Sequence, residues 1–197
     1  MQKIRVDRLN AISCSLQHSS TQQTYSCAAK ALGMAEAIDY KKGMAEACLN
    51  IGIFYLDQRD YLSALKMLLL SNDLAKEIGS HNLQSQTLHQ IGDLYYKIKR
   101  GDLSQRYFSL ALTESQRIHD TNRIIITTLG LSNLSSDSNK SKTAERYLNY
   151  SLFLSLKQHN QVQEAFLYKH LGILHFRRKA YGKALFYWNS SIRLYQK

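Results

Sequence analysis

The 197-residue chain contains no proline, and it has only three cysteines. Proline breaks helix interiors, so its absence permits long uninterrupted helices. The odd number and wide spacing of Cys14, Cys27 and Cys48 argue against a disulfide framework, and no CxxC pair is present for a zinc site. We therefore expect a helical protein of a reducing compartment, the cytoplasm, with its cysteines packed as small apolar residues.

Long apolar runs are also missing. The basic N-terminal segment is not followed by an apolar run of about 7–15 residues, so the sequence does not predict a signal peptide. No stretch approaches the roughly 20 apolar residues that span a bilayer. We therefore expect no membrane partner.

Motifs that carry chemistry are absent as well. The sequence has no Gly-rich phosphate loop, no HExxH and no GxSxG. His119 and His159 occupy equivalent positions of a repeat, and His170 and His175 are five residues apart, which places them on different faces of a helix. We expect neither an enzyme nor a cofactor or metal site.

Acidic residues are in deficit. The chain has 26 Lys and Arg against 15 Asp and Glu, which gives a net charge of +11. Such a balance is typical of proteins that meet an acidic partner, a nucleic acid or an anionic surface.

An interval of 40 residues runs through the sequence. Large apolar residues and small residues each recur at this step, as expected where helices fill a core and where they touch. The recurring positions are Ile51, Ile91, Leu131 and Leu171; Gly52, Gly92 and Gly172; Tyr55 and Tyr95; Ala64, Ser104, Ala144 and Ala184; Leu68, Phe108, Leu148 and Trp188; and Ser71, Ala111, Ser151 and Ser191. Stacked repeats of this kind usually present a surface to a partner.

Each repeat is predicted to be a helix, a turn and a second helix. In the clearest unit the helices span 43–57 and 61–78, because apolar residues recur at steps of three and four. Gly79 follows the last periodic residue, as is usual at the end of a helix. The pattern extends back to helices at 3–18 and 21–38 and forward to a last helix at 181–197.

The sequence therefore predicts one all-α solenoid of about ten antiparallel helices. Its five helix-turn-helix units are predicted to span residues 1–42, 43–82, 83–122, 123–162 and 163–197.

These residues resemble the tetratricopeptide repeat (TPR) family, whose pattern has Leu-Gly, then Tyr, and after the turn Ala, Phe and Ala. The usual TPR unit has about 34 residues, so longer helices are expected here. Ser132 and Ser135 replace the Gly and Tyr of the pattern, and a weaker joint is expected in their unit. The resemblance is to arrays of bacterial signalling and regulatory proteins, and it implies a right-handed superhelix that binds a protein or peptide.

The resemblance also implies that the first helix of each pair lines a concave groove. The position two before the glycine is Asn10, Asn50, Gln90, Gly130 and His170. Side-chain amides there could pair with the backbone of a bound peptide; alternatively they face solvent or bond to local backbone. The further groove residues are His89, Asp93, Tyr96, Asn133, Lys169, Phe176 and Arg177. The family's carboxylate clamp is not reproduced, because Leu49 and Ile53 occupy two of its positions.

Basic residues recur in the turns within the pairs. They are Arg59, Lys97, Lys99, Arg100, Lys140, Lys142, Arg177, Arg178 and Lys179, and we call them the basic edge. Phosphates could bind such an edge with a steep dependence on salt. The alternative function is therefore a nucleic-acid-associated module, and a solvated edge that serves solubility is the simpler interpretation.

The last predicted helix is apolar and aromatic nearly all round. It contains Leu185, Phe186, Tyr187, Trp188, Ile192, Leu194 and Tyr195. Terminal repeats normally have a polar outer face. We therefore expect the chain to continue beyond this helix or to form a homodimer there, and a structural self-assembly element is a further alternative.

Overall fold

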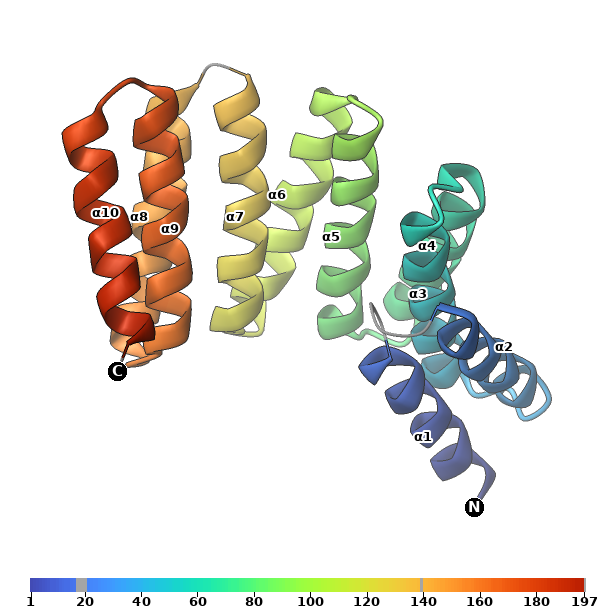
Figure 1. The fold of residues 1–197 in the computed structure, drawn as a ribbon. Coiled ribbons are helices and arrows are strands. Elements are labelled where there is room, and N and C mark those ends of the chain that lie inside the picture. Colours follow the sequence, from blue (N-terminus) through green and yellow to red (C-terminus); the bar gives the residue numbers. More distant parts are fainter. Residues whose placement is uncertain (17–20, 139, 197) are drawn as a thin grey trace. The chain divides into compact units, whose positions relative to one another are not determined.

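A computed structural model describes residues 1–16, 21–138 and 140–196 (Figure 1). This part of the chain forms ten helices and no strand. Their bounds are α1 Gln2–Ser15, α2 Thr21–Glu36, α3 Lys41–Asp57, α4 Tyr61–Glu77, α5 His81–Lys97, α6 Gly101–Arg117, α7 Thr121–Asp137, α8 Ser141–Lys157, α9 Gln161–Arg177 and α10 Tyr181–Tyr195. The predicted all-α repeat fold is confirmed. The predicted end of the first helix, at residue 18, lies outside the described residues.

The helices fall into two compact units, residues 1–118 and 119–197. Helices α1 to α6 form unit 1, and α7 to α10 form unit 2. Consecutive helices within each unit run in opposite directions (Figure 1). The boundary falls directly before α7, the helix in which Ser132 and Ser135 replace the Gly and Tyr of the repeat. That all units form one continuous solenoid stays a prediction.

Most described turns reverse the chain with one residue in the left-handed conformation. These residues lie at steps of 20 or 40 along the chain: Asp39, Arg59, Gly79, Lys99, His119, His159 and Lys179, with φ between 48° and 66°. The predicted turn at 58–60 is confirmed. Cationic side chains suit this place, because the residue follows the negative C-terminal pole of a helix.

The next residue is the N-cap of the following helix, and its side chain caps some helices and not others; Tyr40, which begins α3, makes no side-chain cap bond. Asp60, Ser80, Asp120 and Asn160 each accept a hydrogen bond from the backbone N–H three residues later. Such caps typically stabilise a helix by about 1 kcal/mol. The equivalent residues that begin α6, α8 and α10 make no side-chain cap bond; they are Arg100, Lys140 and Ala180.

The two helices of a pair touch where the repeat places glycine. A Cβ atom on Gly92 would lie 2.7 Å from Cδ1 of Phe108, and one on Gly52 would lie 2.8 Å from Cδ2 of Leu68. Gly172 stands in the same way against Trp188. Each glycine is opposed by the large residue sixteen positions later, so the two recurring positions noted in the sequence form one contact.

Small residues on the second helix of each pair are buried and let the neighbouring helices pack closely. The alanines of the repeat, Ala64, Ala111, Ala144 and Ala184, are at most 1% exposed. Serines at the repeat position of Ala111 add a hydrogen bond to a backbone carbonyl, which the sequence did not predict. Ser71 Oγ donates to the carbonyl of Ala45 at 2.8 Å, and Ser191 Oγ donates to that of Ala165 at 2.7 Å.

We predict opposite effects of alanine at two helical glycines. Gly92→Ala inserts a methyl group against Phe108, and overpacking of this kind costs about 1–3 kcal/mol of unfolding free energy. Gly33→Ala meets no atom within 4 Å, so the better helix propensity of alanine should stabilise by about 0.5–1 kcal/mol. Urea unfolding followed by circular dichroism measures both. Equal effects of the two substitutions would contradict this account of the glycine contact.

Candidate functional site

Three odd-numbered helices of unit 1 line a cavity of about 410 Å³. Helices α1, α3 and the start of α5 contribute Asp7, Asn10, Ala11, Cys14, Lys42, Glu46, Leu49, Asn50, Ser80, Asn82, Leu83 and Gln86. These are the helices that the TPR resemblance assigns to the groove. We call this site the inner cavity of unit 1.

Two predicted groove residues, Asn10 and Asn50, lie in its wall and are 4% and 5% exposed. Asn10 Nδ2 donates to the Gly43 carbonyl at 3.0 Å and to Glu46 Oε2 at 3.4 Å. Asn50 Nδ2 donates to the backbone carbonyl of Asn10 at 3.1 Å. These amide nitrogens therefore join α1 to α3. That the two side-chain amides pair with a bound peptide stays a prediction.

The carboxylates of the inner cavity were not predicted as site residues. Glu46 is held near Lys42, with 3.7 Å between Oε1 and Nζ, and burial raises the pKa of Glu46 although Lys42 opposes the shift. Asp7 is hydrogen-bonded to the Tyr40 hydroxyl, and burial followed by this bond raises the pKa of Tyr40 to about 12.

Neither carboxylate recurs at the 40-residue step, so the repeat gave no signal for them. Asp7 and Glu46 do precede the two asparagines by three and four residues. That spacing places them on the same helix faces and could have revealed them.

Unit 2 has a smaller cavity of about 130 Å³ between α7 and α9. It is lined by Ser132, Asn133, Ser136, Leu148, His170, Ile173, Leu174 and Arg177. Three predicted groove residues therefore meet here: Asn133, His170 and Arg177. Arg177 Nη1 lies 3.2 Å from both Ser136 Oγ and Asp137 Oδ1, which holds its guanidinium at the cavity.

The other groove residues of α9 have mixed surroundings. His170 packs on Phe166, with 4.6 Å between ring centroids, and burial followed by the charge of Lys169 lowers the pKa of His170. Lys169 is exposed. Phe176 is also exposed, and its ring packs against Tyr181 at 5.6 Å.

Helix α5 carries the remaining predicted groove residues. The His89 ring lies 5.2 Å from that of Phe108, and Asp93 Oδ2 pairs with Lys97 Nζ at 3.2 Å. Gln90 is half-buried. His89, Asp93 and Gln90 line neither the inner cavity of unit 1 nor the smaller cavity of unit 2.

Part of the basic edge borders a second cavity of about 410 Å³ in unit 1. It is lined by Leu56, Asp57, Arg59, Tyr61, Tyr96, Lys97 and Lys99. Tyr96, predicted as a groove residue, lies in the last turn of α5 and lines this cavity, with Lys99 Nζ 5.7 Å from its ring centroid. The site combines cations with two aromatic rings.

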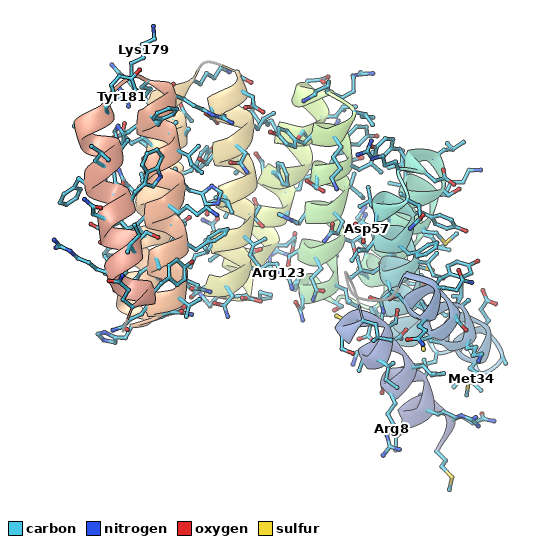
Figure 2. The ribbon with its side chains drawn as sticks, viewed as in Figure 1. Arg8, Met34, Asp57, Arg123, Lys179 and Tyr181 are labelled. Carbon is cyan, nitrogen blue, oxygen red and sulfur yellow. The ribbon has the colours of Figure 1, made fainter. Side chains whose placement is uncertain are left out.

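The basic edge is only partly neutralised. Arg100 lies 3.7 Å from Asp102, and Arg178 donates to Glu145 Oε2 at 2.6 Å. Within the described ranges, five cations of the edge have no carboxylate partner: Arg59, Lys99, Lys140, Lys142 and Lys179. Lys179 lies at the turn that joins α9 to α10 (Figure 2).

Helix α10 exposes apolar side chains. Leu185, Phe186, Ile192 and Tyr195 are each between 51% and 65% exposed. The predicted homodimer or continuation of the chain at this helix stays a prediction.

Neither a metal site nor a membrane-spanning helix is found among the residues that the structure describes. No group of three or more His, Cys, Asp and Glu side chains among them could hold a metal ion. None of their helices combines the length and apolarity that a membrane crossing needs.

Solved structures share this fold. BtubC from P. vanneervenii superposes with a TM-score of 0.78 at 16% identity, over 90% of this chain and 74% of that one. Aspartyl phosphate phosphatase F from Bacillus subtilis gives 0.75 at 13% identity, over 98% of this chain and 61% of that one. TPR-like repeats of a putative kinesin light chain from Podosopora anserina superpose with a TM-score of 0.74 at 7% identity, over 96% of this chain and 94% of that one.

The chain therefore has a TPR-like fold, as its sequence predicts. It spans less than two thirds of the length of the phosphatase-named relative. No protein-family model matches the sequence, and no curated protein matches it significantly.

A buried histidine at the tyrosine position of the repeat makes the stability of the fold depend on pH. His175 occupies that position in α9, is 2% exposed and stacks on Tyr187 at 5.2 Å. Burial lowers its pKa, although Glu145 opposes the shift. The unfolded chain, with a His pKa of about 6.5, therefore binds more protons at mildly acidic pH, and stability falls as pH drops below about 6.5.

We predict that His175→Tyr weakens this loss of stability. Thermal melts at neutral pH and near pH 5 compare the variant with the parent chain. Gln158→Asn, which exchanges one neutral side chain for another at an exposed position, is the control and should leave the pH dependence unchanged. An unchanged pH dependence in His175→Tyr would contradict the assignment.

Proposed function

We propose that this chain is a protein- or peptide-binding repeat module. The observation that carries the proposal is that each unit has a cavity lined mainly by its odd-numbered helices. Polar and charged side chains outnumber apolar ones in both linings, so both cavities offer many groups that can orient and select a bound segment. The TPR-like fold supports this, because stacked helix pairs present extended binding surfaces.

We further propose a regulatory or scaffolding role in a bacterial signalling system, in the cytoplasm. The likeness to a bacterial protein named as an aspartyl phosphate phosphatase supports this setting. The groups that line the cavities are suited to recognition. Neither cavity contains a nucleophile paired with a base, so we propose a binding role rather than catalysis.

Selection from a displayed library of random linear peptides tests the proposal. We expect enriched peptides whose affinity falls about tenfold or more, 1.4 kcal/mol, when an arginine fills a cavity mouth. Asn82→Arg addresses unit 1 and Asn133→Arg addresses unit 2. Fluorescence anisotropy with labelled peptides measures the affinities.

Controls for this selection lie on even-numbered helices. Lys66→Glu on α4 and Arg146→Glu on α8 are exposed and should leave peptide affinity unchanged. Failure to enrich any peptide would contradict the proposal. Binding that is indifferent to both cavity substitutions would do the same.

A phosphate-bearing partner at the basic edge is the second candidate. Arg100 and Lys140 occupy the positions that begin α6 and α8, and neither caps its helix. A cation there faces the positive pole of the helix, so it does not serve helix stability. The uncapped N-terminus and the cation beside it both favour binding of an anion from outside the chain.

We predict that a single-stranded oligonucleotide binds this edge at low salt. The logarithm of the affinity should then fall with the logarithm of the salt concentration, with a slope of about −0.7 per phosphate contact. The double substitution Arg59→Glu with Lys99→Glu should abolish binding, whereas Lys66→Glu should not. Absence of binding at low salt, or equal loss in the control, would exclude the edge as a phosphate site.

A further inference from the structure

The inner cavity of unit 1 contains acceptor oxygens that have no hydrogen-bond partner. Asp7 Oδ1 and Asn10 Oδ1 are both buried and receive no hydrogen bond, and both residues line the cavity. Asn10 is itself only 4% exposed. Buried polar atoms in native proteins nearly always have a partner, from the protein or from ordered water, so two acceptors without a protein partner at one cavity mark a place for a donor from outside the chain.

The orientation of the Asn10 amide is fixed by its neighbours. Its nitrogen faces the Gly43 carbonyl at 3.0 Å and Glu46 Oε2 at 3.4 Å. A carbonyl and a carboxylate only accept hydrogen bonds. Exchanging the nitrogen and oxygen of the amide would place acceptor against acceptor, so the oxygen is the atom left without a partner.

The cavity is negative within a basic protein. Two carboxylates, Asp7 and Glu46, line it with one cation, Lys42, which leaves one net negative charge. Lys42 lies 3.7 Å from Glu46, and its side chain is 54% exposed. It therefore balances one carboxylate from the solvent side. The charge of Asp7 has no cationic partner among the described residues.

We infer that this cavity binds the guanidinium group of an arginine side chain on a peptide partner. The inference rests on the proposed peptide-binding function and names the chemistry that one of its sites selects. Asp7 and Asn10 are three residues apart on α1, so their oxygens lie on one helix face. Glu46 adds a carboxylate from α3.

An arginine fits this set of acceptors better than a lysine does. Guanidinium presents five N–H donors in a plane, is more weakly hydrated than ammonium, and keeps its charge on burial. A volume of about 410 Å³ lies within the usual range for a ligand site, so the side chain can enter.

Titration of the full chain with capped tripeptides tests the inference directly. The probes are Ac-Gly-Arg-Gly-NH₂, the same peptide with the uncharged isostere citrulline, the same peptide with lysine, and Gly-Gly-Gly-NH₂ with a free amino terminus. Backbone amide shifts in ¹H–¹⁵N spectra report the site. We expect the arginine peptide, at millimolar concentration, to shift the amides around Asp7, Asn10 and Glu46.

Isosteric variants separate charge from shape. Asp7→Asn and Glu46→Gln should each weaken the arginine peptide about tenfold, the size expected for loss of a charge-assisted hydrogen bond. Asn82→Asp adds a carboxylate at the cavity and should strengthen binding instead. Asp73→Asn on α4 removes an exposed carboxylate away from the cavity and should change nothing.

The outcomes decide between the possible ligands. Equal shifts with citrulline, or no shifts with arginine, would overturn the inference. Stronger binding of the lysine or free-amine peptide would overturn the choice of arginine. Selected peptides that bind through the inner cavity of unit 1 without a basic residue would overturn this inference and leave the proposed function intact. A failed peptide selection would count against the proposed function alone, because the tripeptide titration reports on the cavity independently.

Discussion

Three helix pairs are held in register by the close approach of their two backbones at a glycine. Gly52, Gly92 and Gly172 stand directly against a large apolar residue of the following helix. A methyl group at these glycines would separate the helices, and interiors packed to crystal density do not accommodate such a change. The inner cavity of unit 1 is lined by α1, α3 and the start of α5, so its walls come from the first helix of three successive pairs.

Most of the fold could be predicted from the sequence because its causes repeat. The 40-residue step gave the number of helices, the turn at 58–60 and the paired glycine and large positions. What the step did not show is the 20-residue spacing of the left-handed turn residues. Only Gly79 among them is a glycine, and single Asp, Arg, Lys or His residues give no clear local signal of a positive φ.

The site was less predictable because its residues break the repeat. Asn133, His170 and Arg177 were grouped by their repeat positions, and all three line one cavity; that this cavity binds a partner stays a prediction. Asn10 and Asn50 were grouped by the same reasoning, yet their nitrogens join α1 to α3. A repeat position gives the face of a helix, whereas the partner of a side chain depends on neighbours such as Glu46 that occur once.

Net charge was a poor guide to the chemistry of the inner cavity of unit 1. A charge of +11 predicts an acidic partner for the chain as a whole. Exposed charges more than about 10 Å apart are largely screened at physiological salt, so groups within a cavity outweigh the total. The proposed selection of a cationic side chain therefore rests on Asp7 and Glu46, while the unpaired cations lie at the turns. The proposed cation site and the proposed anion site lie on different parts of unit 1, because α1, α3 and the start of α5 line the first, and residues at or next to the turns within two helix pairs line the second.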